Sequence, residues 1–319
     1  MNVRWGLAEL PGLLADVGLE RPFLVASLRW DAPVEVAGDW REVPSDRIGE
    51  AAGRVRGADS LLAVGGGSAI DLAKAIAVET DLPVVSVPTT YSGAEWTPSF
   101  GIRDHDRRMR GGGAGATLAG IVYEPELTLG LPRAETVGTS MNALAHTAEA
   151  LYVKGRNDEG DREALVGARL IGQWLPRVVE SPDELEARRN LLEGALHAGA
   201  ALAAAGLGLA HAMAQALGGR FGLPHGAMNA LTLAPALRFN EPVAEREIAR
   251  FGEALRTSDP AARVQELARL GGYQRLRDQG VPENQLATVA EAAADRPGAR
   301  ANPRPATSSQ ISELLRSIY

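Results

Sequence analysis

The sequence predicts two domains of different class, an α/β domain over residues 1–133 and an all-helical domain over residues 134–319. Short apolar runs alternate with helical patterns in the first part of the chain. From Arg133 onward the strand signals stop and only helical patterns follow. A chain of 319 residues is long enough to bury two cores. No long linker separates the two parts, so the boundary is a change of architecture.

The first domain contains four apolar runs of the length of buried strands, at residues 22–28, 60–64, 83–87 and 118–123. They read PFLVASL, SLLAV, PVVSV and LAGIVY. Helical patterns over residues 45–56 and 69–79 lie between them. Buried strands that alternate with helices are typical of a parallel sheet covered on both faces.

The sheet is trimmed at its start. Only about five residues separate the strand that ends near Leu28 from the next β-like run, Val34–Ala37. A crossover through a helix needs roughly a dozen residues or more. The first crossover helix is therefore missing, or these two segments pair as a hairpin.

The second domain is expected to be helical throughout. Alanine- and leucine-rich helical patterns cover residues 136–153, 159–179, 182–204, 209–217 and 225–237. A proline-rich segment at residues 296–305 precedes a last amphipathic helix over residues 308–318.

The composition excludes several classes of function. A formal charge of −7 argues against a nucleic-acid binder, because phosphate contacts need clustered lysine and arginine. The absence of cysteine excludes disulfides, thiolate metal sites and a cysteine nucleophile. We see neither a membrane-spanning stretch nor a signal peptide, so we expect a cytoplasmic protein without a membrane partner.

A glycine-rich loop, Gly65-Gly66-Gly67-Ser68, ends one predicted strand and opens a predicted helix. Glycines let the backbone approach a phosphate, the helix start offers free N–H groups, and Ser68 can cap the helix or bond a phosphate oxygen. The loop matches neither GxGxxG nor the P-loop, and by itself it could be a tight turn. A second polar loop, residues 89–93, follows the next strand, at the edge where open α/β sheets bind ligands.

Three of the five histidines, His146, His211 and His225, lie in apolar, small-residue surroundings. Burying a histidine costs free energy unless its nitrogens are bonded, so this set predicts a site. His105, in a charged loop, and His197, on an alanine-rich helix, are interpreted as ordinary residues.

Taken together, these motifs resemble the group III, iron-containing alcohol dehydrogenase family, and most closely its maleylacetate reductase branch, within the wider dehydroquinate-synthase-like superfamily. The resemblance covers nearly the whole chain and implies a nucleotide-binding α/β domain followed by an all-helical domain. The matching motifs are, in chain order, residues 65–68 (GGGS), 88–95 (PTTYSGAE), 122–128 (VYEPELT), 142–146 (NALAH), the stretch from His211 to Pro224-His225, and 302–305 (NPRP).

The resemblance implies that the chain binds NAD(H) or NADP(H). Asp39 could bond the ribose hydroxyls, which would favour NAD(H), or it could be a turn aspartate. Arg108 matches a position near the cofactor where many members have lysine. The other implied cofactor-binding residues are Gly65, Gly66, Gly67, Ser68 and Asp71, with Thr89, Thr90 and Ser92 on the second loop.

The resemblance also raises the question of a metal. Members that use a divalent metal (Fe or Zn) hold it with one aspartate and three histidines, and the matching positions are Asn142, His146, His211 and His225. Asn142 and His146 share one helix face, but the amide brings no charge to neutralise an ion. Gln215 likewise stands where relatives often have histidine. We expect function without metal, with metal binding as the alternative.

The implied reaction is NAD(P)H-dependent reduction of an unsaturated oxo-dicarboxylate, of the maleylacetate to 3-oxoadipate type, by a homodimer. His211 or His225 would stabilise the enolate oxygen and deliver the proton, with His146 in support. Arg220 could clamp a substrate carboxylate or form an ion pair at the surface. Glu95 is interpreted as a structural partner. The alternatives are a metal-dependent alcohol or aldehyde dehydrogenase and a non-redox member of the superfamily.

Overall fold

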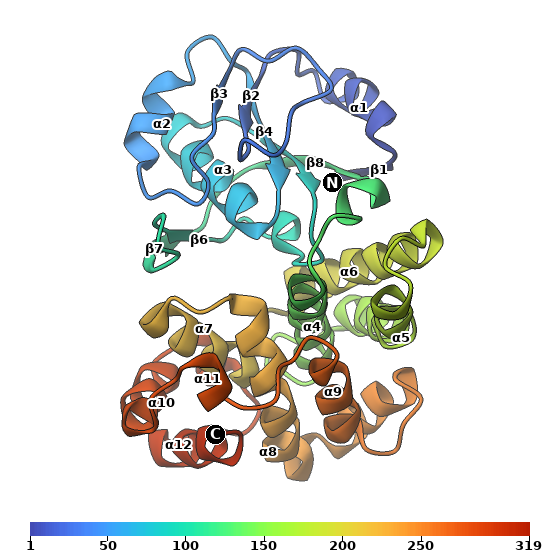
Figure 1. The fold of residues 1–319 in the computed structure, drawn as a ribbon, viewed down its shortest axis with the longest axis vertical. Helices are drawn as coiled ribbons and strands as arrows, with labels where there is room; N and C mark the ends of the chain where they lie inside the picture. Colours follow the sequence, from blue (N-terminus) through green and yellow to red (C-terminus); the bar gives the residue numbers. More distant parts are fainter. The chain divides into compact units, whose positions relative to one another are not determined.

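Two units make up the chain in the computed structural model, which describes residues 1–319 (Figure 1). The first comprises Met1–Thr90 and Ala94–Gly130, and the second comprises Leu131–Tyr319 and the short segment Tyr91–Gly93. The first unit is α/β and the second is helical.

A six-stranded parallel sheet, in the order β1-β8-β5-β4-β2-β3, forms the first unit. The four predicted strands are confirmed as β2 (Pro22–Val25), β4 (Ser60–Gly65), β5 (Val84–Pro88) and β8 (Leu118–Tyr123). The sequence analysis missed the edge strand β1 (Asn2–Trp5). Its side chains are exposed or only partly buried, so it lacks the apolar run of a central strand.

The first crossover contains no helix, as one of the two interpretations predicted. The hairpin interpretation is wrong, because β3 (Gly38–Trp40) pairs with β2 in parallel. The segment at residues 34–37, expected to be a strand, precedes β3 and packs against the sheet instead. Every second side chain of this stretch packs against the core on one face of the sheet, namely Trp30, Ala32, Val34 and Val36. These side chains lie where a crossover helix would otherwise pack.

Helices cover both faces of the sheet (Figure 1). α2 (Ile48–Arg54) and α3 (Gly67–Thr80) pack on one core cluster, and α1 (Leu10–Asp16) packs on the other. A two-stranded antiparallel hairpin, β6 (Phe100–Arg103) and β7 (Met109–Gly113), was not predicted. Its second strand is rich in glycine and exposed, a pattern that carries no strand signal.

The second unit is built around α4 (Arg133–Ala150), which packs against α5, α6 and α8. The predicted helices are confirmed, with α8 longer than expected and bent at Ala244, which has non-helical φ and ψ. The other bounds are α5 (Asp158–Glu180), α6 (Leu185–Ala205), α7 (Leu209–Phe221), α8 (His225–Ala254), α9 (Pro260–Arg269), α10 (Leu286–Ala294), α11 (Pro297–Ala301) and α12 (Ser308–Ser317).

No single helix combines the length and apolar character that a membrane span requires. Helices α6 and α7 reach that composition only as a pair, and the chain bends by 102° between them.

Helix α4 is buried on almost all sides from Thr136 to Ala150. Each polar side chain on such a helix needs a hydrogen-bond partner, because an unpaired polar group inside a protein is costly. The surroundings of Asn142, His146 and Glu149 define the site described next.

Candidate active site

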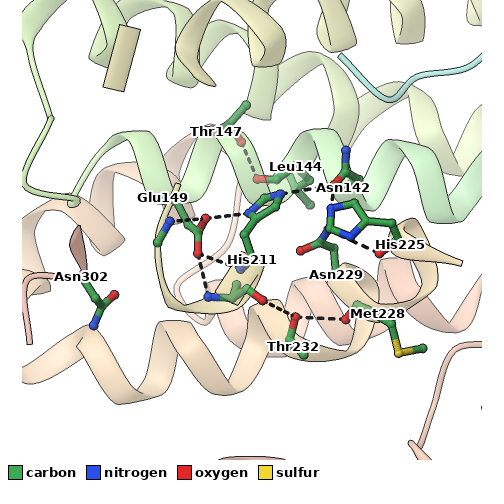
Figure 2. Close-up of polar contacts among 12 residues, drawn as sticks. Asn142, Leu144, Thr147, Glu149, His211, His225, Met228, Asn229, Thr232 and Asn302 are labelled. Atoms are coloured by element: carbon green, nitrogen blue, oxygen red, sulfur yellow. Dashed lines mark hydrogen bonds and ion pairs between the residues drawn. The ribbon is translucent and has the colours of Figure 1, made fainter. Parts of the chain in front are cut away.

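Three imidazoles come together in the second unit. Figure 2 shows two of them, His211 and His225. His146 on α4 stacks on His211 of α7, with ring centroids 4.6 Å apart and planes 13° apart. His225, the first residue of α8, lies with its ring centroid 5.7 Å from that of His211. His146 and His211 are buried and His225 is half-buried. The structure therefore gathers the three histidines that the sequence singled out.

Glu149, which the sequence analysis did not select, is fully buried beside His211 (Figure 2). Its carboxylate accepts hydrogen bonds from the backbone N–H groups of Gly208 and Ala210, both at 2.7 Å, and lies 2.6 Å from His211 Nδ1. A Cβ atom on Gly208 would lie 2.9 Å from Glu149 Oε1, so this glycine is what lets the chain approach the carboxylate. Glu149 stands seven residues after Asn142, about two helical turns along the same face, and that spacing was the available signal.

Asn142 joins three parts of the second unit. Its Nδ2 donates to the carbonyl oxygen of Ser92 at 2.9 Å, and its Oδ1 accepts from Asn229 Nδ2 at 2.7 Å. The same oxygen lies 3.2 Å from His211 Nε2. Because a backbone carbonyl can only accept, the Ser92 contact fixes which end of the amide is the NH₂ group. An aspartate here would set a carboxylate oxygen against that carbonyl oxygen.

The donor set does not fit a divalent cation as placed. Three imidazoles and one amide bring no negative charge, and the carboxylate of Glu149 is held by His211 Nδ1 and backbone amides. Asn229 Nδ2 lies 3.0 Å from His225 Nε2 and also donates to Asn142 Oδ1, so one amide engages two of the four candidate ligand atoms. The structure gathers no group of three or more histidine or acidic side chains with the geometry of a metal site.

Burial, followed by the neighbouring His211 and His225, lowers the pKa of His146 well below its ordinary value. The His146 ring is therefore neutral at pH 7. Two buried atoms in this cluster, His146 Nδ1 and Asn229 Oδ1, have no hydrogen-bond partner. A polar ligand that bonded to them would relieve a desolvation cost.

The glycine-rich loop lies between β4 and α3 in the first unit. Gly65 has a φ of 154°, and a Cβ atom on it would lie 2.8 Å from Ala69 Cβ. A Cβ atom on Gly66 would lie 2.8 Å from Thr90 Cγ2, so the loops after β4 and β5 adjoin. Helix α3 is capped by Gly66 without a side-chain bond, so the capping role expected of Ser68 is wrong. Ser68 is instead exposed in the first helical turn, beside the free amides of the helix start.

The remaining predicted residues are engaged elsewhere. The Asp71 carboxylate lies 2.8 Å from Lys74 Nζ and accepts from the Gly101 N–H at 3.1 Å. Asp39, on β3, accepts from Arg41 Nε at 2.9 Å, and Thr89 donates its N–H to Gly65 O at 3.0 Å. Arg108 is exposed in the turn between β6 and β7.

Arg220, the residue expected to clamp substrate, is exposed near the end of α7. Its Nε donates to Gln285 Oε1 at 3.1 Å. No polar contact joins it to the three histidines. The structure therefore does not bring Arg220 into the imidazole cluster, because the side chain points toward the η5 turn (Glu283–Gln285).

Glu95 belongs to a buried chain of hydrogen bonds in the first unit. Trp96 Nε1 donates to Tyr123 Oη at 2.8 Å, and Tyr123 Oη donates to Glu95 Oε1 at 2.7 Å. Burial is the main cause that raises the pKa of Glu95. Its partners are the structural ones that the sequence analysis expected.

Replacing Glu95 with glutamine is expected to remove a pH-dependent destabilisation. A raised carboxyl pKa means that the folded state binds its proton more tightly, so the stability it contributes is complete below the unfolded pKa of about 4.3 and is lost as pH rises through the folded value. Relative to the wild type, Glu95→Gln should gain at most about 1.4 kcal/mol per pH unit across that window. Urea unfolding from pH 4 to 8 measures this. A difference in unfolding free energy that stays constant with pH would contradict it.

Comparisons with known proteins identify the family of this chain. A family model described as iron-containing alcohol dehydrogenase matches residues 24–117, and one for the C-terminal part of the Fe-containing alcohol dehydrogenase family matches residues 136–319. A maleylacetate reductase of Burkholderia cepacia is 39% identical over 288 residues, which cover 90% of this chain and 79% of the relative.

Two solved structures share the fold. The crystal structure of maleylacetate reductase from Agrobacterium tumefaciens superposes with a TM-score of 0.90 at 30% identity, covering 100% of this chain and 95% of the other. An iron-containing alcohol dehydrogenase from Corynebacterium glutamicum gives a TM-score of 0.91 at 31% identity, covering 100% and 94%. The chain belongs to the iron-containing alcohol dehydrogenase family.

Proposed function

We propose that this chain is an NAD(P)H-dependent reductase that converts maleylacetate, or a closely similar unsaturated oxo-dicarboxylate, into its saturated oxo-acid. The several relatives that carry the name maleylacetate reductase support this reading. The observation that carries it is the cluster of His146, His211 and His225 around Asn142, because a ketone oxygen that becomes an enolate needs such hydrogen-bond donors.

The α/β part of the chain, residues 1–133, is proposed to bind the dinucleotide. Gly65, Gly66, Gly67 and Ser68 provide a close backbone approach and the N–H groups of a helix start, which suit a pyrophosphate. Thr89 and Thr90 adjoin this loop, and Ser92 follows in the same segment. Asp39 and Arg108 are proposed as further cofactor contacts from the resemblance. Titration of the protein with each dinucleotide would measure whether it prefers NAD(H) or NADP(H).

The helical part, residues 134–319, is proposed to hold the substrate. Bound NAD(P)H supplies a hydride to the alkene carbon that lies farther from the ketone. His211 and His225 then stabilise the charge on the ketone oxygen, and one of them delivers a proton to the carbon next to that ketone. His146, neutral at pH 7, supports the His211 ring by stacking. The unpartnered His146 Nδ1 and Asn229 Oδ1 offer further bonds to an oxygen-rich substrate.

Turnover is proposed to need no metal. Both ends of the Asn142 amide are hydrogen-bonded to protein groups. The carboxylate of Glu149 is likewise bonded to His211 and to backbone amides. Enzyme treated with a chelator is therefore expected to keep its full rate. A rate that is lost on chelation and returns only with Fe²⁺ or Zn²⁺ would favour the metal-dependent alcohol dehydrogenase instead.

The proposed activity is tested by mixing the enzyme with NADH or NADPH and maleylacetate and following the loss of reduced-nicotinamide absorbance. The same assay with saturated ketones and aldehydes is the control. We expect consumption of one cofactor per maleylacetate and no consumption with the saturated compounds. The opposite preference would overturn the proposal, and failure to bind either dinucleotide would favour a non-redox member of the superfamily.

The proposal includes a homodimer in the cytoplasm, as the family resemblance implies. Light scattering coupled to gel filtration measures the assembly directly. A monomer of 33.6 kDa would contradict it.

A further inference from the structure

Arg296 is a half-buried arginine that has no acidic partner. It is the residue that caps α11, in the second unit. Its guanidinium bonds only to Gln215, from Nη1 to the side-chain oxygen and from Nη2 to the backbone oxygen, both at 3.3 Å. Its Nε is buried and makes no hydrogen bond. The guanidinium thus keeps strong donor capacity that the protein does not use.

Gln215 ties this guanidinium to α7, the helix that carries His211. It follows His211 by four residues on α7, so the two side chains lie on one helix face about one turn apart. Helix α11 also packs closely on the start of α7, since a Cβ atom on Gly298 would lie 2.4 Å from the Gly208 carbonyl oxygen. The same stretch, Gly208–His211, carries the backbone amides and the imidazole that Glu149 binds.

An arginine removed from water without a counter-ion carries an energetic cost. Burial lowers the pKa of Arg296, and it is the only cause of the shift, so no neighbouring carboxylate offsets it. Most other half-buried or buried cations in this chain have an acidic partner, as Arg250 has in Asp161 and Lys74 in Asp71. A carboxylate that reached Arg296 would offset this cost and could bond it through two parallel N–H groups.

We propose that Arg296 binds one of the two carboxylates of the substrate, with Gln215 holding the guanidinium in place. The inference rests on the proposed function, since it assigns a subsite for an oxo-dicarboxylate. It replaces the role expected of Arg220, which is exposed and bonded to Gln285. Gln215, which holds the guanidinium, lies one helical turn from His211, and the substrate is a small molecule whose ketone is two bonds from a carboxylate.

The test is Arg296→Gln, with Arg296→Lys as the variant that keeps the charge. Steady-state kinetics are measured with maleylacetate and with two half-substrates, each lacking one carboxylate. We expect Arg296→Gln to raise KM for maleylacetate by roughly 10- to 100-fold, the worth of a hydrogen-bonded charge pair. KM for one half-substrate should be unchanged, KM for NADH should be unchanged, and Arg296→Lys should recover part of the loss.

Arg238→Gln is the matched control, because Arg238 is an exposed arginine that also bonds a glutamine, Gln265. It should leave all constants unchanged. An Arg296→Gln variant with unchanged KM, or with KM raised equally for both half-substrates, would overturn the proposal. So would a selective loss in Arg220→Gln instead.

Binding of an unreactive dicarboxylate separates this inference from the proposed activity. Calorimetry with adipate and the enzyme bound to NADH should show affinity that falls at least roughly 10-fold in Arg296→Gln and not in Arg238→Gln. If the wild type binds adipate in this way but does not reduce maleylacetate, the activity fails and the subsite stands. If adipate binds both variants equally, the subsite fails whatever the activity.

Discussion

Replacing Glu149 with glutamine is expected to lower kcat by roughly 100- to 10,000-fold, the range seen when a carboxylate that sets a catalytic imidazole is neutralised. The carboxylate accepts a hydrogen bond from the Nδ1–H of His211, which orients the ring so that Nε2 faces Asn142. A glutamine would present an NH₂ group to Nδ1 or to the amides of Gly208 and Ala210, which are themselves donors. KM for NADH should stay unchanged, because the residues proposed to bind the cofactor lie elsewhere in the chain.

Thr232→Val is the control for this variant. In the wild type the Thr232 hydroxyl donates to the Ala210 carbonyl oxygen at 2.9 Å. Removing this hydroxyl loosens the start of α7 without changing any group that contacts the imidazole. Nitrogen NMR of labelled histidine should show that the tautomer of His211 changes in Glu149→Gln and not in Thr232→Val. If both variants lose the same stability and the same activity, Glu149 is only a structural cap and the account of His211 is wrong.

Replacing Asn142 with aspartate is expected to lower the rate measured without metal and to let the site bind a metal ion. The variant loses the donor to Ser92 O and sets two acceptor oxygens about 3 Å apart, which should lower the metal-free rate by roughly 100-fold or more. It also adds a carboxylate to three imidazoles, a ligand set that suits Zn²⁺ or Fe²⁺. Elemental analysis should find close to one metal per chain in Asn142→Asp and none retained by the wild type after dialysis.

Asn240→Asp is the matched control, because Asn240 is also a buried asparagine that bonds an amide, that of Asn302. It should lose stability without gaining metal. Equal metal content in the wild type and in Asn142→Asp would contradict the interpretation that Asn142 makes hydrogen bonds and is not a metal ligand.

The sequence predicted the parts of the fold that follow from continuous apolar patterns. The strands at residues 22–25, 60–65, 84–88 and 118–123 are buried on both faces, so their runs are visible without any knowledge of tertiary structure. The absence of a first crossover helix was predicted from the short gap before the run at residues 34–37, although that run is not a strand and twelve residues separate β2 from β3. The edge strand β1 and the hairpin β6–β7 were missed, because exposed short strands carry no such pattern.

The candidate site could likewise be predicted from the sequence only in part. His146, His211 and His225 stood out because histidine is rare in this chain and costly to bury. Glu149 and Arg296 did not stand out, because the role of each depends on a partner far along the chain. The partner is 62 residues away for Glu149 and 81 residues away for Arg296. Arg220 was chosen for its proximity in sequence to the histidines, yet nine residues along α7 are about two and a half helical turns, which puts its side chain on the face opposite to His211.

We propose that imidazoles and an asparagine, without a metal, support hydride addition to a conjugated alkene. The most direct measurement is the position of deuterium in the product when chelator-treated enzyme reduces maleylacetate with NADH deuterated at the transferable position. We expect deuterium on the former alkene carbon that lies farther from the ketone, with the ketone intact. Deuterium on a carbinol carbon, where the ketone had been, or no product until Fe²⁺ or Zn²⁺ is added, would contradict it.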